Sequence, residues 1–159
     1  MPRKKKVTFW ACDFETTVWG EKVEQENRKK QDSTEVWSGA DVALYDDTEN
    51  VTITHSIRDF LNRFLTMNGN NILYFHNLAF DGSFIVDFLL KEGWEWVHCK
   101  DKEMRSKQFQ TCISDMGAWY WVKLKWNKTF LEIRNSLKLM PSSLKNIGKS
   151  FGTKHQKLD

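Results

Sequence analysis

Residues 73–85 (LYFHNLAFDGSFI) constrain the fold more than any other stretch of this chain. The apolar run over residues 72–75 predicts a short strand, and the pattern after the polar turn predicts an amphipathic helix opening at Asp81. The turn brings the amide of Asn77 and the carboxylate of Asp81 to a helix N-terminus, which favours negative charge. The sequence therefore predicts a strand–turn–helix junction that carries polar chemistry.

A second acidic element lies near the start of the chain. Residues 7–15 (VTFWACDFE) are rich in strand formers and follow a basic tail. Because side chains alternate between the two faces of a strand, Asp13 and Glu15 are expected on the same face. Two adjacent carboxylates repel each other unless a cation or solvent offsets their charge. An Asp-x-Glu pair alone is weak evidence for a metal site, because chance and surface turns also produce it.

The combination with Asp81 makes a metal site the stronger hypothesis. Open sheets hold ligands beyond the ends of their strands, so Asp13 and the turn over residues 77–81 are expected to meet there. Mg²⁺ and Mn²⁺ prefer carboxylate and water oxygens. Two such ions about 3.5–4 Å apart can activate water and stabilise the leaving oxygen in phosphodiester cleavage. Asp13, Glu15 and Asp81 are therefore the predicted metal ligands.

The region between these two acidic elements predicts further strands and a helix. Strand patterns cover residues 35–45 and 51–54, around a turn at Asp46 and Asp47. Ser56 caps a helix that ends near Gly69. Residues 20–34 are charged without periodicity and are expected to form a flexible, exposed loop.

The region after the predicted Asp81 helix has a different hydrophobic pattern. Short alternating runs between residues 94 and 133 predict two hairpins near or continuous with the sheet, and Ser142 and Ser143 cap a last short helix. The order of elements predicts an α/β fold with a mixed central sheet, the acidic first strand near its centre, flanking helices and extra β-hairpins. We expect one domain over residues 1–159.

Charge and cysteine content narrow the class of protein. The net charge is only +3, but lysines crowd both ends of the chain, which favours a polyanionic partner; a solvated lysine face is the alternative. Three scattered cysteines without a CxxC pair indicate a reducing compartment and no structural zinc. No stretch approaches the ~18 apolar residues of a membrane helix. A cytoplasmic location is expected.

Four segments, in the same order, resemble the proofreading domain of protein-primed family B DNA polymerases, which replicate phages and linear plasmids. Residues 12–17 (CDFETT) and 74–85 (YFHNLAFDGSFI) resemble the first two exonuclease motifs of that family. Residues 116–120 (MGAWY) and 136–141 (SLKLMP) also resemble that domain. The resemblance implies an RNase H-like 3′–5′ exonuclease fold of the DEDD type, which uses Mg²⁺ or Mn²⁺.

The resemblance also implies roles for individual residues. Asp13 would bridge two metal ions, Glu15 would hold the ion that activates water, and Asp81 would hold the other. The residues that would line a single-stranded 3′ end are Thr16, Asn77, Phe80, Ser136 and Leu137. Those that would touch single-stranded DNA or terminal protein are Tyr74, His76 and Phe84. From the residues alone, Tyr74 and Phe84 also suit a core, and His76 and Ser136 also suit turn caps.

One motif of that family is missing from these 159 residues. A Tyr-x-x-x-Asp segment would supply a fourth carboxylate, and none is present. We therefore expect a domain that is incomplete at its C-terminus, with weak or no nuclease activity alone and no polymerase activity. A terminal protein, a remaining polymerase part or a host protein is a possible partner. The alternative is a non-catalytic phage or mobile-element protein that reuses the fold, as an inhibitor of a host nucleoprotein or a replication accessory.

Overall fold

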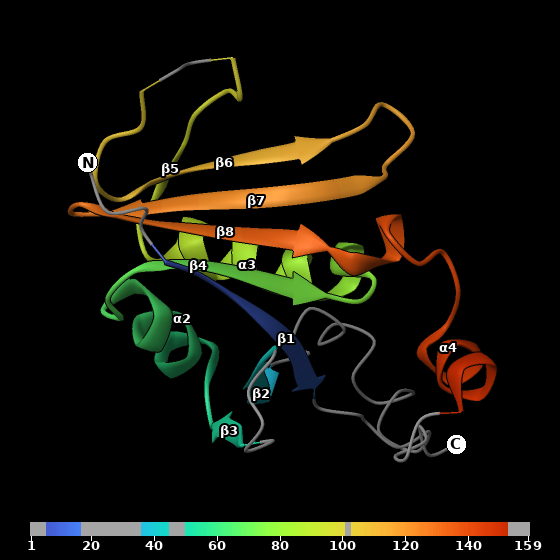
Figure 1. Ribbon diagram of the computed structural model, residues 1–159. Helices are drawn as coiled ribbons and strands as arrows, with labels where there is room; N and C mark the ends of the chain where they lie inside the picture. The colour runs from blue at the N-terminus through green and yellow to red at the C-terminus, as the bar shows by residue number, and fades with distance from the viewer. Residues whose placement is uncertain (1–5, 17–35, 45–49, 101–102, 153–159) are drawn as a thin grey trace, which may run out of the picture.

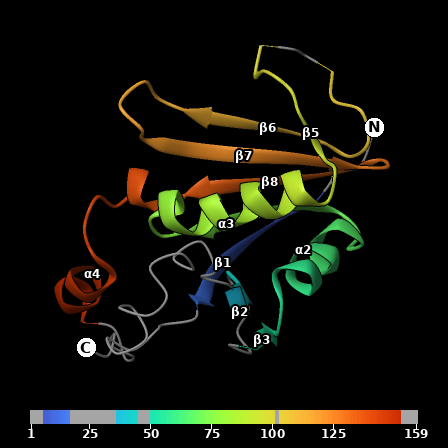
Figure 2. The same ribbon diagram turned by 180° about the vertical axis from the view of Figure 1, so that it is seen from behind.

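The computed structural model describes residues 6–16, 36–44, 50–100 and 103–152. The expected loop over residues 20–34 and the expected turn at Asp46 and Asp47 lie outside the described residues. The described part forms one mixed sheet with helices (Figures 1 and 2). None of the described helices is both long and apolar enough to cross a membrane.

The strands of the first half form the centre and one side of the sheet. These are β1 (Val7–Thr16), β2 (Val36–Ala43), β3 (Val51–Thr54) and β4 (Asn70–Phe75). The later strands are β5 (Glu95–Trp96), β6 (Gln108–Ile113), β7 (Trp119–Trp126) and β8 (Thr129–Asn135). Their order across the sheet is β3-β2-β1-β4-β8-β7-β6-β5. The acidic strand β1 is therefore internal, as expected, and the predicted hairpins β6–β7 and β7–β8 continue the same sheet.

Three helices and one short turn of helix complete the described fold. They are α2 (Ile57–Leu65), α3 (Leu78–Lys91), the 3₁₀ turn η2 (Ser136–Lys138) and α4 (Leu144–Phe151). Ser56 caps α2 by accepting a hydrogen bond from the Asp59 amide at 3.0 Å, as its sequence predicts. Helix α3 begins at Leu78, three residues before the predicted start at Asp81, because Asn77 makes the turn in the left-handed conformation with a φ of 67°. Asp81 therefore lies inside the first turn of α3.

The core lies between one face of the sheet and helices α2 and α3. Trp10 and Phe14 of β1 pack edge-on against Phe64 and Phe60 of α2, while Phe75 of β4 also packs against Phe14. Figure 1 looks onto the opposite face of the sheet, with α3 behind it, and Figure 2 shows α3 in front. Residues that alternate with the core residues, such as Asp13, therefore belong to the uncovered face.

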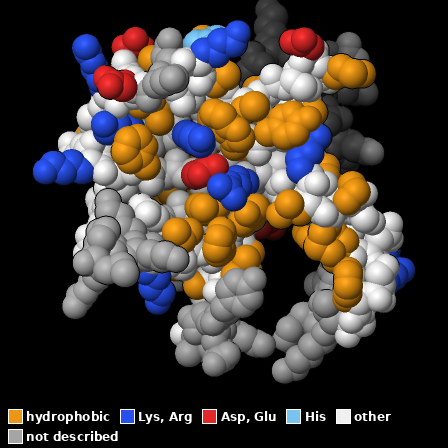
Figure 3. Space-filling view, turned by 45° about the horizontal axis from the view of Figure 1, so that its top comes forward, with side chains coloured by type: hydrophobic (Ala, Val, Ile, Leu, Met, Phe, Trp, Pro, Cys, Tyr) orange, Lys and Arg blue, Asp and Glu red, His pale blue; other side chains and the backbone are white. Residues whose placement is uncertain are grey.

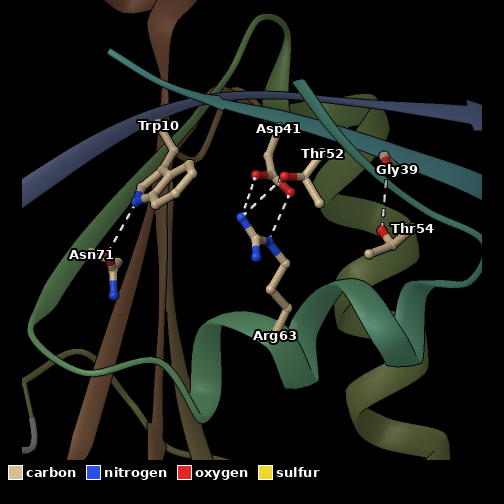
Figure 4. A network of polar contacts seen from close by, with 7 residues as sticks. All are labelled: Trp10, Gly39, Asp41, Thr52, Thr54, Arg63 and Asn71. Carbon is tan, nitrogen blue, oxygen red and sulfur yellow. Dashed lines mark hydrogen bonds and ion pairs between the residues drawn. The ribbon is translucent and has the colours of Figure 1, made fainter. Parts of the chain in front are cut away.

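A buried ion pair connects α2 to β2 (Figure 4). Arg63 donates hydrogen bonds to both carboxylate oxygens of Asp41, at 3.1 and 3.3 Å, and to the hydroxyl of Thr52 at 3.3 Å. The Asp41 side chain is fully buried, whereas 29% of the Arg63 side chain is exposed. The guanidinium also lies over the ring of Trp10, 5.4 Å from its centroid. The pair fixes α2 against the strand that neighbours β1.

Candidate exonuclease site

The carboxyl ends of three parallel strands meet at one edge of the sheet. Cys12 of β1 is opposite Phe75 of β4, which is opposite Asn135 of β8. The next residue along each of these strands is Asp13, His76 or Ser136. The register therefore brings residues from three distant parts of the sequence to one edge, where Asp13 and the turn after β4 were predicted to meet.

The carboxylates of Asp13, Glu15 and Asp81 interact across this edge. Asp13 and Glu15 are exposed and lie on one face of β1, whereas Asp81 is only 4% exposed. Burial, followed by repulsion from Asp13 and then Glu15, raises the pKa of Asp81 to about 7. A hydrogen bond from the Phe14 backbone amide lowers the pKa of Asp81 in part, so its carboxyl group is held close to β1.

The buried Asp81 side chain has an unsatisfied oxygen. Its Oδ1 atom is buried and has no hydrogen-bond partner among the residues that the structure describes. A buried acceptor without a partner costs about 1–3 kcal/mol, and more if it is charged. A proton or a cation would remove that cost, and a divalent cation would also offset the repulsion from Asp13 and Glu15. The oxygen-only donor set of these carboxylates suits Mg²⁺ or Mn²⁺.

The three carboxylates do not form a closed set of ligands by themselves. Within the described ranges, no group of three or more His, Cys, Asp or Glu side chains is arranged to hold a metal ion. Such clustering is costly without a cation, because each carboxylate repels the others. The donor chemistry and the unsatisfied oxygen of Asp81 therefore fit a divalent ion, while a ligand geometry is not present.

His76 ties two of the strand ends together. Its Nε2 lies 2.5 Å from the carbonyl oxygen of Ser142, so Nε2 carries the proton and donates to it. Its Nδ1 lies 3.1 Å from Ser136 Oγ and, in the neutral ring, accepts a hydrogen bond from that hydroxyl. His76 thus links the end of β4 to η2 and to the segment before α4.

A pocket of about 630 Å³ lies on the uncovered face beside this edge. Asp13, Tyr74, His76 and Ser136 line it together. The rest of its wall is mostly apolar and is formed by β1, β2, β3 and the segment that leads into α4. The further lining residues are Phe9, Ala11, Cys12, Ala40, Asp41, Val42, Leu44, Val51, Leu139, Met140 and Leu144.

Three further predicted residues, Thr16, Asn77 and Leu137, are not among those that line this pocket. Thr16 is half-buried at the end of β1, after a bulge between Glu15 and Thr16. Asn77 is exposed, and its side chain makes no capping hydrogen bond to α3. Leu137 is half-buried in η2, where its amide donates to Asn135 Oδ1 at 3.0 Å.

Two predicted aromatic residues form a separate pair on α3. Phe80 is 50% exposed and meets the half-buried Phe84 edge-on, with ring centroids 5.3 Å apart. Neither lines the pocket that contains Asp13 and His76. The structure therefore brings Tyr74, His76 and Ser136 together beside Asp13, and places Phe80 and Phe84 on the neighbouring helix.

Sequence reasoning missed two residues that support the site. Arg134 donates a hydrogen bond to the Tyr74 hydroxyl at 3.3 Å and pairs with Glu132. Asn135 is buried and donates to the backbone oxygen of Trp119 at 2.9 Å. The alternation of β8 contained a signal for both, since Arg134 and Asn135 fall on opposite faces just before the Ser136 turn.

Gly82, next to Asp81, lets Trp119 of β7 pack closely against α3. A Cβ atom at Gly82 would lie 2.9 Å from the Trp119 ring. A Gly→Ala change inside a helix ordinarily stabilises it by about 1 kcal/mol, but overpacking here costs about 1–3 kcal/mol. We expect Gly82→Ala to lower the free energy of unfolding in urea. In a Trp119→Leu background the same change should be neutral or stabilising, and equal losses in both backgrounds would contradict this explanation.

Comparisons with known proteins identify the family of this chain and agree with its fold. Residues 63–159 match the family of DNA polymerase type B, organellar and viral. The DNA polymerase of Bacillus phage B103 is 33% identical over 156 residues, which are 95% of this chain and 23% of that polymerase. The DNA polymerase of Streptococcus phage Cp-1 is 30% identical over 154 residues, and the match covers 90% of this chain and 23% of that polymerase.

Solved structures give the same result. Phi29 DNA polymerase complexed with primer-template DNA superimposes with a TM-score of 0.79 at 28% identity, covering 97% of this chain and 25% of that one. The same polymerase complexed with single-stranded DNA superimposes with a TM-score of 0.77 at 29% identity, covering 96% of this chain and 25% of that one. The chain spans about a quarter of the length of these polymerases.

The chain belongs to the organellar and viral family B DNA polymerases. The part of the phage polymerases that it matches is their exonuclease domain, so the RNase H-like fold inferred from the motifs is confirmed.

Proposed function

We propose that these residues form a 3′–5′ exonuclease-like unit that binds the end of single-stranded DNA with Mg²⁺ or Mn²⁺. The observation that carries the proposal is the buried carboxylate of Asp81, which is repelled by Asp13 and Glu15 and has one oxygen without a hydrogen-bond partner in the described part of the chain. The structural relatives include a polymerase complexed with single-stranded DNA. Asp13, Glu15 and Asp81 are the proposed metal ligands.

Each part of the site has a proposed task. Divalent ions bound to the carboxylates would activate water and stabilise the leaving oxygen. His76 and Ser136, which are hydrogen-bonded to each other, would fix the wall of the pocket beside Asp13 and orient the terminal nucleotide. Tyr74 and Phe80 offer stacking faces, and Asn77 offers an amide that can both donate and accept. Thr16, Phe84 and Leu137 would border the strand.

We infer weak activity for these 159 residues alone. Three carboxylates hold fewer ligand oxygens than the four acids implied by the motifs, and poor positioning of the reacting groups can cost ~10²-fold in rate. A segment carrying a fourth carboxylate, from the same polypeptide or a partner, would raise the activity. The rest of a polymerase, terminal protein or a host protein are the proposed partners. The relatives named above are all DNA polymerases, which gives the alternative of a non-catalytic binding protein no support.

The test is shortening of a 5′-labelled oligothymidylate by excess protein in Mn²⁺. We expect stepwise loss from the 3′ end, which a blocked 3′ end prevents. Asp13→Asn and Asp81→Asn should each lower the rate by ~10²-fold or more, whereas Asp87→Asn, an exposed change on the same helix, should not.

Mn²⁺ should also raise the melting temperature of the wild type. A ligand at ~100 times its dissociation constant adds about 2.7 kcal/mol of stability. The double variant Asp13→Asn/Asp81→Asn should lose this rise. The proposal fails if Mn²⁺ changes neither the melting temperature nor the length of the oligonucleotide.

A further inference from the structure

The uncovered face of the sheet continues from the carboxylate edge across β4, β8 and β7. Ala11, two residues before Asp13, is opposite Tyr74; Tyr74 is opposite Arg134; and Arg134 is opposite Trp121. Neighbouring strands lie ~4.8 Å apart. A continuous row of side chains therefore leads from the first strand to Trp121, about 14 Å away.

Cationic and aromatic side chains alternate at the far end of this row. The Lys123 ammonium lies over the Trp121 ring, 4.2 Å from its centroid, and the Lys125 ammonium lies 4.9 Å from the centroid of the Phe130 ring. Phe130 is 54% exposed. We name this surface the β7–β8 platform. It consists of Trp121, Lys123, Lys125, Phe130 and Arg134.

The platform carries a net positive charge, because three cations lie beside one acid, Glu132. Among the described ion pairs, Glu132 pairs with Arg134, and neither Lys123 nor Lys125 belongs to any of them. Glu132 is opposite Lys123, so it offsets one charge of the platform. Residues 103–152 contain nine Lys or Arg against three Asp or Glu, whereas residues 51–100, which include α2 and α3, contain four against five. Residues 103–152 are therefore the more basic of these two parts, and Lys123, Lys125 and Arg134 of the platform are three of their nine cations.

Lys123, Lys125 and Phe130 of the platform border a hollow of about 760 Å³. Its other lining residues are Glu103, Met104, Arg105, Gln110, Leu131 and Glu132. In Figure 3, which shows this side of the molecule, hydrophobic side chains gather between Lys and Arg side chains. The Phe130 ring and the ammonium groups of Lys123 and Lys125 offer a stacking surface and phosphate contacts in the same place.

We propose that the β7–β8 platform binds single-stranded nucleic acid, on a track separate from the carboxylates that leads the strand towards them. The direction of the track rests on the proposed function, but the binding itself does not. Lysines held over rings match the requirements of a single strand, whose phosphates need cations and whose exposed bases need flat partners. An acidic protein segment would use the cations but would gain less from Trp121 and Phe130.

The test measures binding of labelled oligothymidylates of ~4 and ~16 nucleotides, a range that spans the site sizes of single-strand binders. EDTA is present, so the carboxylate site has no metal and the 3′ end is not consumed. We expect the longer strand to bind at least ~10-fold more tightly, since one stacked base contributes ~1–3 kcal/mol. Lys123→Gln/Lys125→Gln should remove that advantage and reduce the salt slope by ~1.4, that is, ~0.7 for each phosphate contact.

Two further variants separate the platform from general charge and from folding. Arg58→Gln/Lys91→Gln removes the same charge from α2 and α3 and should leave the length advantage intact. Trp121→Leu keeps the charge, removes the stacking face, and should weaken the longer strand ~10-fold. Lys123 and Lys125 are half-buried on the uncovered face, outside the core, so the circular dichroism spectrum of the double variant should stay that of the wild type.

The outcomes distinguish this inference from the proposed function. No binding of the longer strand in EDTA at low salt, or binding unaffected by the lysine changes, would overturn the platform even if Mn²⁺-dependent shortening occurs. Equal competition by poly-glutamate of the same charge, with no effect of Trp121→Leu, would assign the surface to acidic proteins and also overturn it. Platform-dependent binding in EDTA supports the inference even if no shortening is found.

Discussion

In metal-free buffer, the stability of Asp81→Asn to urea, measured relative to the wild type, should rise by up to about 4 kcal/mol between pH 4 and pH 8. Asparagine keeps the shape of the buried side chain and can still accept the hydrogen bond from the Phe14 amide. It carries no charge at any pH, so it does not repel Asp13 or Glu15. The measurement is the free energy of unfolding in urea, with EDTA, across this pH range.

The sign follows from the direction of the pKa shift. Burial and repulsion raise the pKa of Asp81 from 3.8 to about 7 in the folded chain. The folded state therefore binds the proton more tightly than the unfolded state does. The stability that the protonated group contributes is complete below pH 3.8 and is lost as the pH rises through 7. The gap between variant and wild type should open across that window.

Asp87→Asn controls for the loss of one carboxylate, because Asp87 is an exposed residue of the same helix that pairs with Lys91. The free energy of unfolding of Asp87→Asn should differ from the wild-type value by well under ~1 kcal/mol, because most exposed ion pairs contribute little. If the gap for Asp81→Asn were the same at pH 4 and pH 8, the buried carboxyl group would not be under the repulsion that the metal hypothesis requires.

Arg63→Met should cost about 3–5 kcal/mol of unfolding free energy, because it leaves the Asp41 carboxylate buried without a partner. Asp41→Asn should cost less, since 29% of the Arg63 side chain is exposed and its charge can reach water. The double change Asp41→Leu/Arg63→Met should recover much of the loss, because an apolar pair leaves no buried charge. Urea unfolding of the four proteins measures these differences.

Arg58→Met supplies the matched control on α2. Arg58 also pairs with a carboxylate, that of Glu92, but its side chain is 56% exposed. Exposed pairs contribute ~0–1 kcal/mol. Equal costs for Arg58→Met and Arg63→Met would contradict the view that burial makes the Asp41 pair important.

Much of the fold was predictable because local patterns and tertiary structure agree. The apolar strand before His76, the Ser56 cap and the hairpins all appear as their sequences indicate. The start of α3 differs because Asn77 reverses the chain in the left-handed conformation, for which the sequence contains only a weak signal. Local conformation at a single residue moved that boundary by three positions.

The chemical grouping was predictable only in part. Asp13 and Glu15 were selected at the end of an apolar strand and Asp81 at the start of the predicted helix, but the burial of Asp81 depends on tertiary packing. The Arg63–Asp41 pair and the Tyr74–Arg134 contact join residues far apart in the chain. The hydrophobic periodicity of the sequence does not predict such contacts, because they depend on which strands become neighbours.

The two edge strands of the sheet affect how the molecule can bind other chains. Its outermost strands, β3 and β5, contain four and two residues. Such short borders offer few free backbone groups to a strand from another molecule, and so discourage edge-to-edge aggregation. Recognition by this domain is accordingly expected to rely on side chains displayed on its broad surfaces, with little contribution from extension of the sheet.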